Sequence, residues 1–97
     1  PQTYGVPVEE IVRGIKSGVR KVNVDTDCRM AITGAIRKIF AENPKEFDPR
    51  KYLKPAIEEM QKVCEARYIA CGAAGHADKI KVVPMSVMAK RYADGEI

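Results

Sequence analysis

The sequence predicts a mainly α-helical chain with one β-strand, of the kind found in α/β folds. In four separate segments, apolar residues recur every three or four positions, which is typical of amphipathic helices. Between the first two of these segments, residues 19–24 alternate apolar and polar side chains, which is typical of a half-buried strand. The strand runs directly into a polar cluster and a helix, an arrangement at which parallel α/β folds bind ligands.

The first helix is predicted over residues 7–17. Its apolar side chains fall on one face: Val8, Ile11, Val12 and Ile15. Pro7 suits the first turn of this helix and Gly18 its C-terminal cap. The predicted strand, residues 19–24, follows at once. In it, Val22 and Val24 alternate with Lys21 and Asn23.

Two longer helices come next. The second is predicted over residues 27–42, with Thr26 or Asp27 as its N-cap. The third is predicted over residues 49–71, with Asp48 as N-cap and Pro49 as its first residue. Pro55 lies early in this third helix, so we expect a kink there or a later start.

The C-terminal part begins with a glycine-containing break at residues 72–75 and an extended stretch at residues 79–83. A short helix over residues 84–93 follows, and no repeat divides the chain, so residues 1–97 are predicted to form a single segment. One strand cannot pair its own backbone groups. We therefore expect it to pair with a second copy or to belong to a larger sheet. The 97 residues are too few for a complete eight-fold α/β barrel, which needs about 250.

Composition excludes several classes of function. The net charge of +4 is weak evidence for nucleic-acid binding, and the 6% aromatic content without Trp disfavours base stacking. No apolar run approaches the roughly 20 residues that span a membrane. Three cysteines without CxxC spacing indicate a reducing compartment, so we predict a cytoplasmic protein. From the charge, the aromatic content and the apolar runs we predict no nucleic-acid or membrane partner. His76 is the only histidine, and we assemble no zinc site from this sequence.

Several stretches closely resemble the last barrel segments of class II, zinc-dependent fructose-1,6-bisphosphate aldolases. The resemblance begins with Tyr-Gly-Val-Pro-Val-Glu-Glu-Ile at residues 4–11. It continues with Gly-Ile-Lys-Ser-Gly-Val-Arg-Lys-Val-Asn-Val-Asp-Thr-Asp at residues 14–27. Further similar stretches are residues 29–31, 33–37, 47–56 and 64–68. The long match around Asn-x-Asp-Thr-Asp is specific, and the similarity covers nearly the whole chain.

The resemblance implies that the chain is the C-terminal fragment of a (β/α)8 TIM barrel, with residues 19–24 as the eighth strand. It implies substrate-binding roles for four residues. Asn23 would contact the dihydroxyacetone phosphate moiety, and Asp25 and Thr26 would help to hold its phosphate. Arg50, from the Asp-Pro-Arg motif, would bind the far phosphate of fructose 1,6-bisphosphate and reach toward a neighbouring subunit's site.

The family's zinc ligands, its proton-transferring aspartate and its monovalent-cation loops all precede these motifs and are absent from this sequence. We therefore expect zinc in the full-length parent but none bound by this chain, no catalytic residue here, and no activity of the 97 residues alone. The parent would reversibly cleave fructose 1,6-bisphosphate to dihydroxyacetone phosphate and glyceraldehyde 3-phosphate, a step of glycolysis, gluconeogenesis and the Calvin cycle. Its partners would be a sugar phosphate and further copies in a homo-oligomer.

Plainer interpretations of the same residues stay open. Asn23, Asp25 and Thr26 could simply cap a strand end and form a turn. Arg50 could be a solvated residue in the first turn of a helix. The whole chain could be a non-catalytic helical module for self-association or interaction. Within the aldolase interpretation, the sequence does not distinguish fructose from tagatose bisphosphate.

Overall fold

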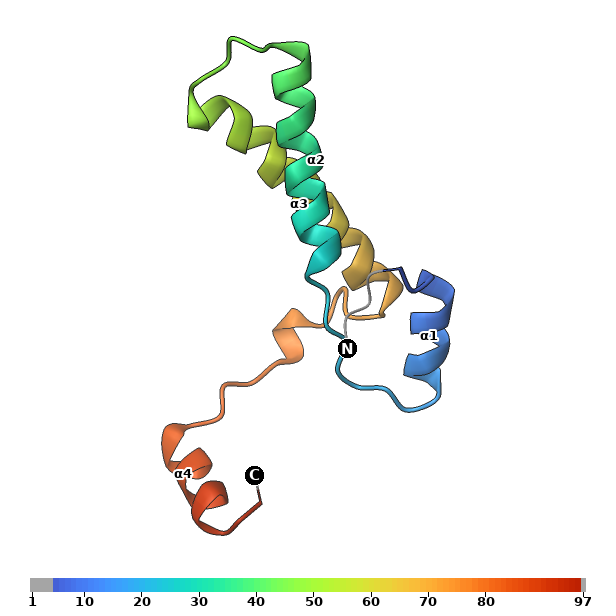
Figure 1. Cartoon of the computed structure of the whole chain (residues 1–97). Coiled ribbons are helices and arrows are strands. Elements are labelled where there is room, and N and C mark those ends of the chain that lie inside the picture. The colour runs from blue at the N-terminus through green and yellow to red at the C-terminus, as the bar shows by residue number, and fades with distance from the viewer. Residues whose placement is uncertain (1–4, 97) are drawn as a thin grey trace.

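The computed structural model describes residues 5–96, which form four α-helices and one short 3-10 helix. Figure 1 shows them in chain order: α1 (Val8–Lys16), α2 (Thr26–Glu42), α3 (Pro49–Ala70), η1 (Ala77–Lys79) and α4 (Met85–Ala93). Tyr4, which opens the stretch that resembles the aldolase family, lies outside the described residues.

The centre of the fold is a hairpin of α2 and α3, the pair of elements with the most extensive contact. The two helices are antiparallel, because the start of α2 meets the end of α3. There the Sγ atoms of Cys28 and Cys64 are 3.9 Å apart. At the other end, the rings of Phe40 and Tyr52 pack with their centroids 5.0 Å apart. Between these contacts along α3 lies Ala56, a small residue that is only 1% exposed.

The ends of α3 follow directly from the sequence. The Asp48 carboxylate accepts a hydrogen bond from the backbone N–H of Arg50, and Pro49 is the first helical residue, as predicted. Pro55 lies inside the helix and does not delay its start. At the C-terminus, Gly72 has a φ of 76°, and the Ala73 N–H donates to the carbonyl of Tyr68. This is the αL termination that glycine permits without strain.

The start of α2 differs from the prediction. The N-cap is Asp25, not Thr26 or Asp27, and its side chain does not cap the helix. The reason is that its carboxylate pairs instead with Arg29, one turn into the helix. Asp27 is occupied by a different partner, described below.

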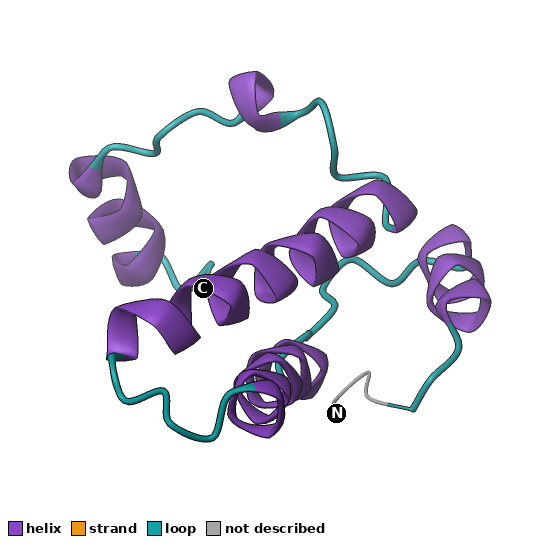
Figure 2. Ribbon diagram, turned by 90° about the horizontal axis from the view of Figure 1, so that it is seen from above, coloured by secondary structure: helices purple, strands orange, loops and turns teal. Residues whose placement is uncertain are grey.

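The predicted strand at residues 19–24 is not formed in the described part of the chain. These residues make the loop between α1 and α2, and Figure 2 shows only loops between the helices. A strand is defined by the partner with which it exchanges hydrogen bonds, and residues 5–96 place no other extended segment beside this one. The alternation itself persists, because Val22 and Val24 are half-buried while Lys21, Asn23 and Asp25 are exposed.

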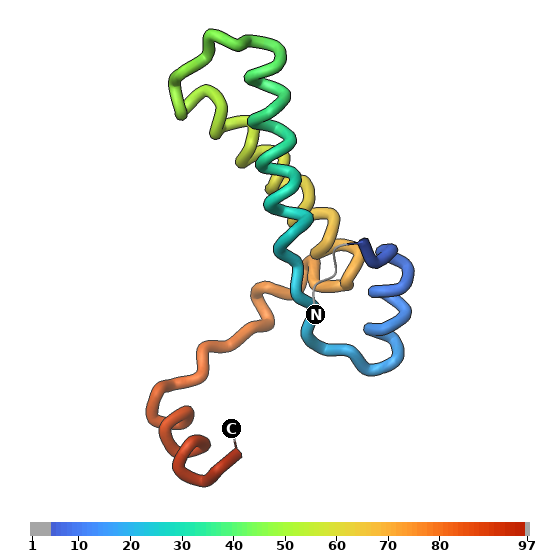
Figure 3. The backbone as a smooth tube through the Cα atoms, viewed as in Figure 1, coloured from blue at the N-terminus to red at the C-terminus, as the bar shows by residue number. Residues whose placement is uncertain are grey.

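The described chain is far from compact. Its radius of gyration is 18.7 Å, against about 13 Å for a compact domain of about 100 residues. Figure 3 shows the reason: the segment after α3 runs out in extended form, and α4 stands apart from the hairpin. Among the described residues only three apolar side chains are buried, Ile11, Cys28 and Ala56. No helix in the described range is long and apolar enough to cross a membrane.

We expect the substitution Ala56→Leu to destabilise the α2–α3 hairpin. The added side chain has no space between the helices, and overpacking of this kind costs about 1–3 kcal/mol. Urea unfolding followed by circular dichroism measures the loss. Ala66→Leu is the matched control, because Ala66 lies on the exposed side of α3 and its replacement should change the free energy of unfolding by less than about 0.5 kcal/mol. Equal effects of the two substitutions would contradict the packing described here.

Candidate functional site

The candidate site is the loop of residues 19–25 together with the helix ends around it. A groove of about 520 Å³ lies beside this loop. The residues that line it come from α1, the loop, α2, the C-terminal part of α3 and the segment just after α3: Ile15, Val19, Arg20, Val22, Val24, Cys28, Cys64, Arg67, Tyr68, Cys71 and Ala73. Val22 and Val24 line the groove, whereas the intervening Asn23 does not. Over residues 22–24 the alternation therefore places Asn23 on a polar side of the loop away from the groove, whereas Arg20 lines the groove beside Val19.

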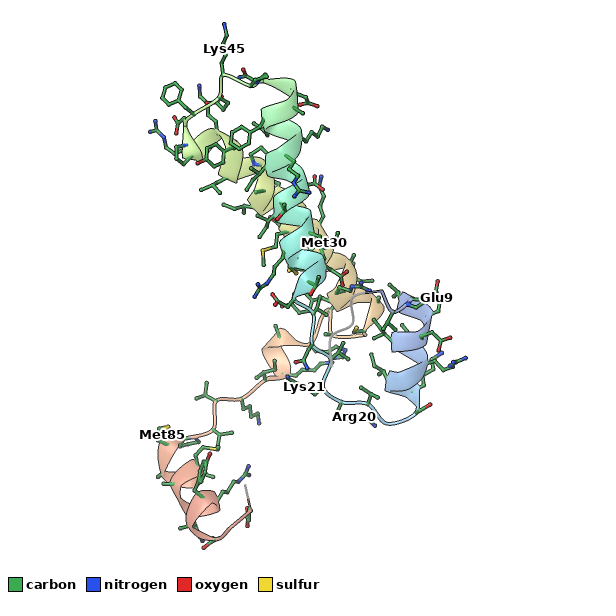
Figure 4. The ribbon with its side chains drawn as sticks, viewed as in Figure 1. Glu9, Arg20, Lys21, Met30, Lys45 and Met85 are labelled. Carbon is green, nitrogen blue, oxygen red and sulfur yellow. The ribbon has the colours of Figure 1, made fainter. Side chains whose placement is uncertain are left out.

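Asn23 is held on this polar side by its neighbour. The Nζ atom of Lys21 donates a hydrogen bond of 2.5 Å to the Oδ1 atom of Asn23. Figure 4 shows Lys21 and Arg20 on the loop that joins α1 to α2. The ammonium group of Lys21 thus brings a positive charge to the predicted substrate-binding residue.

Asp25 and Thr26 stand where the loop becomes α2. The Nε atom of Arg29 lies 2.9 Å from the Oδ2 atom of Asp25, in a pair that is exposed to solvent. Thr26 is the first residue of the helix and is half-buried. The Asp25 side chain makes no cap hydrogen bond, and the N-terminus of α2 carries the positive end of the helix dipole, which favours an anion. Asn23, Asp25 and Thr26 are thus brought together at one corner.

Sequence reasoning missed the ion pair that fixes this corner to the hairpin. The Nη2 atom of Arg67 donates a hydrogen bond of 3.0 Å to the Oδ2 atom of Asp27. The two residues are 40 positions apart. Local patterns report on neighbours within one turn of a helix, so no spacing rule could have joined them. The only sequence signal is that each has the charge the other needs.

The two thiols at the same end of the hairpin are part of the packing. Burial, followed by the neighbouring Cys64 thiol, raises the pKa of the Cys28 thiol. A raised pKa favours the neutral thiol, which is a poor nucleophile. The three cysteines of the chain are free. Cys28 therefore acts as a small apolar residue between α2 and α3.

Arg50 does not join this corner within one chain. It lies in the first turn of α3, at the opposite end of the hairpin, and α2, with 17 residues, sets a separation of about 25 Å. In Figure 4, Lys45 on the loop before α3 marks the end of the hairpin near Arg50, and Lys21 on the loop before α2 marks the end near the corner. The Nε and Nη2 atoms of Arg50 donate to the two carboxylate oxygens of Asp48 at 3.0 and 2.8 Å.

The Asp48 contact fixes the direction of the Arg50 side chain without enclosing it. Its hydrogen bonds from the Arg50 side chain and backbone hold the pKa of the Asp48 carboxyl below its ordinary value. The Arg50 side chain is nevertheless 90% exposed. Guanidinium carries five N–H donors, so the donors that Asp48 does not occupy can still contact a second anion.

The described residues do not provide a metal centre. No group of three His, Cys, Asp or Glu side chains in residues 5–96 is arranged to hold an ion. The Nδ1 atom of His76 lies 3.0 Å from the Nζ atom of Lys79, a partner that a metal-bound imidazole would not have beside its ligating nitrogen. The zinc that the family uses does not fit the donor set of this segment, so no step is derived through it.

Several known proteins are similar to this chain. Residues 3–76 match the sequence profile described as "Fructose-bisphosphate aldolase class-II". The chain is similar to "Fructose-bisphosphate aldolase 2" of Rhodobacter capsulatus, with 67% identity over the whole chain and 85% of that protein. It is 64% identical to "Fructose-bisphosphate aldolase 2" of Cereibacter sphaeroides and to "Fructose-bisphosphate aldolase" of a Nostoc species, in both cases over the whole chain.

The share of this chain that is covered differs from the share of the relatives that is covered. The chain is covered completely in all three, but it spans only 27% of the length of the Cereibacter and Nostoc proteins. The profile match extends over both α1 and the α2–α3 hairpin, and therefore over the corner and Arg50. This chain belongs to the class II fructose-bisphosphate aldolase family.

Proposed function

We propose that the chain is the C-terminal segment of a class II fructose-bisphosphate aldolase barrel and supplies part of its sugar-phosphate site. The parent enzyme would cleave fructose 1,6-bisphosphate reversibly to dihydroxyacetone phosphate and glyceraldehyde 3-phosphate. Family membership and the 27% coverage of longer relatives support a segment of a larger enzyme. The three free cysteines support a reducing, cytoplasmic compartment. We propose no nucleic-acid or membrane partner.

The observation that carries the proposal is the alternation in residues 19–24. Val22 and Val24 line the groove against α2 and α3, and Asn23 and Asp25 lie on the exposed side. In a (β/α)8 barrel, one face of each strand packs on the helices and the other points inward, and ligands bind at the C-terminal ends of the strands. Residues 19–24 would become such a strand when a neighbour pairs with them. Asn23 would then face the barrel interior at its active end.

Each predicted residue of the corner has a role in substrate binding in this proposal, either direct or through the turn that it orders. Asn23 orients the dihydroxyacetone phosphate half of the substrate through its side-chain amide. Thr26 and the N-terminus of α2 hold the phosphate, for which a helix N-terminus is well suited, and Asp25 orders the turn through Arg29. The metal and the group that moves the proton come from outside this segment, which therefore contributes substrate binding and no bond-breaking group.

Arg50 serves a different site in this proposal. The length of α2 keeps it about 25 Å from the corner of its own chain, which supports a contact with the far phosphate in a neighbouring subunit. Asp48 holds the guanidinium in one orientation while leaving it 90% exposed. The enzyme would accordingly be a homo-oligomer in which each subunit completes another's site.

The first test is the activity of the 97-residue chain compared with that of the longer aldolase polypeptide that contains it. We expect cleavage of fructose 1,6-bisphosphate, coupled to the oxidation of NADH, only from the longer polypeptide with zinc. The segment should stay inactive at every zinc concentration, because residues 5–96 lack a three-ligand group. Zinc-dependent cleavage by the pure segment would refute its predicted inactivity. Absence of cleavage by the longer polypeptide would refute the proposed function.

The second test separates the two ends of the hairpin in the longer enzyme. Arg50→Ala should lower kcat/KM for fructose 1,6-bisphosphate about 10- to 100-fold, because it removes a charge-assisted contact of about 1.5–3 kcal/mol. The KM for dihydroxyacetone phosphate in the condensation direction should stay unchanged. Asn23→Ala is the matched comparison. It should lower kcat/KM for fructose 1,6-bisphosphate and also raise the KM for dihydroxyacetone phosphate. If Arg50→Ala impairs both substrates equally, or neither, its assignment to the far phosphate is wrong.

The third test concerns assembly of the isolated segment. Its accessible surface is 8080 Å², against about 5,500 Å² for a compact protein of this mass, so we expect self-association at micromolar concentration. Sedimentation velocity measures it. Val82 is 93% exposed, and Val82→Lys should weaken association more than Ser86→Lys, which adds the same charge without removing an apolar side chain. A folded monomer at these concentrations would count against the prediction.

A further inference from the structure

The contact between Asp27 and Arg67 differs from the other ion pairs of the described chain. Those pairs join residues at most five positions apart. The Asp27–Arg67 pair instead joins the first turn of α2 to the last turns of α3. Its side chains are 20% and 19% exposed, whereas the other pairs are open to solvent on at least one side. Among the ion pairs of the described residues, this is the one that joins α2 to α3.

The position of Asp27 makes this connection relevant to the corner. Asp27 directly follows Thr26 and lies one helical turn or less from Asn23 and Asp25. None of these three corner residues lines the groove, and the apolar residues of the loop that line it are Val19, Val22 and Val24. Apolar contacts are non-directional, so the valines determine which face of the loop is buried and specify its position along the groove only weakly. A directed contact at Asp27 fixes the start of α2, and with it the corner, along the axis of the hairpin.

The energetics of such a pair favour a geometric role over a stabilising one. A partly buried ion pair must give up hydration on both sides, so replacing it with apolar groups often leaves stability unchanged. The net free-energy contribution of this pair is reduced further, because the Nη1 atom of Arg67 is buried without a hydrogen-bond partner among the described residues. The single hydrogen bond from Nη2 to the Asp27 carboxylate is directional, because the planar guanidinium fixes the direction in which each N–H donates.

We propose that Arg67 is a positioning residue of the aldolase: through Asp27 it holds the N-terminus of α2, and thereby Asn23 and Thr26, in the arrangement that binds the dihydroxyacetone phosphate half of the substrate. The inference rests on the proposed function. Arg67 itself touches no substrate in this account. Its effect is confined to the half of the substrate that the corner serves.

The test measures both triose phosphates in the condensation direction, with the longer, zinc-loaded aldolase. Arg67→Met should raise the KM for dihydroxyacetone phosphate about tenfold, since small displacements of a binding group have effects of this order. The KM for glyceraldehyde 3-phosphate should change less than twofold. The fold-change in kcat should be smaller than the fold-change in the KM for dihydroxyacetone phosphate. Arg67→Lys, which keeps the charge but not the fork, should restore only part of the affinity.

A double-mutant cycle separates positioning from general damage to the fold. If Arg67 acts through Asp27, then Asp27→Asn and Arg67→Met together should raise the KM for dihydroxyacetone phosphate no more than Arg67→Met alone. Lys62→Met is the matched control, because it removes an exposed ion pair with Glu59 on the same helix and should leave both KM values unchanged. Asp27→Asn preserves the side-chain shape and Arg67→Lys preserves the charge, so the test does not depend on the folding of Arg67→Met.

The outcomes distinguish the two levels of inference. A wild-type enzyme without aldolase activity removes the proposed function. An active wild type in which Arg67→Met leaves the KM for dihydroxyacetone phosphate unchanged, or raises both KM values together, removes the positioning role alone. Additive effects of Asp27→Asn and Arg67→Met would also overturn it, because the two residues would then act independently.

Discussion

The rest of the structure depends on the packing of α2 against α3. Ala56 lets the two helices approach, the ring pair of Phe40 and Tyr52 closes one end, and the Asp27–Arg67 pair closes the other. This one contact determines which residues can meet. It gathers Asn23, Thr26 and the groove at one end of the hairpin, and it carries Arg50 to the other. Of the outer helices, α1 contributes one buried side chain, Ile11, and α4 contributes none among the described residues.

Local features of the fold could be predicted because their causes are local. Asp48 and Pro49 specify the start of α3 through a side-chain cap and a preset φ angle, and Gly72 ends it through a positive φ. The strand could not be predicted correctly as a formed element, because a strand depends on a partner that a single sequence window does not contain. What the window does contain, the alternation of Val22 and Val24, is present in the pattern of burial.

The candidate site divides in the same way. Asn23, Asp25 and Thr26 are adjacent in sequence, so their common location at the start of α2 follows from one motif. The distance of Arg50 from that corner depends on the length and direction of α2, which the hairpin contact settles. The Asp27–Arg67 pair joins residues on two helices and could be found only in the structure. Even the cap of α2 depends on competition, since Arg29 takes the Asp25 carboxylate that could otherwise cap the helix.

The loop at residues 19–24 has a consequence for the order in which a barrel would close. The hairpin beside it is made of contacts between neighbouring helices joined by a short turn, which form early because little loop entropy is lost. The loop already presents its apolar face to that hairpin, so only its hydrogen-bonding edges await partners. Such a segment can be added to a sheet as its final strand. The barrel would then close with the α2–α3 hairpin already packed on the outer face of that strand.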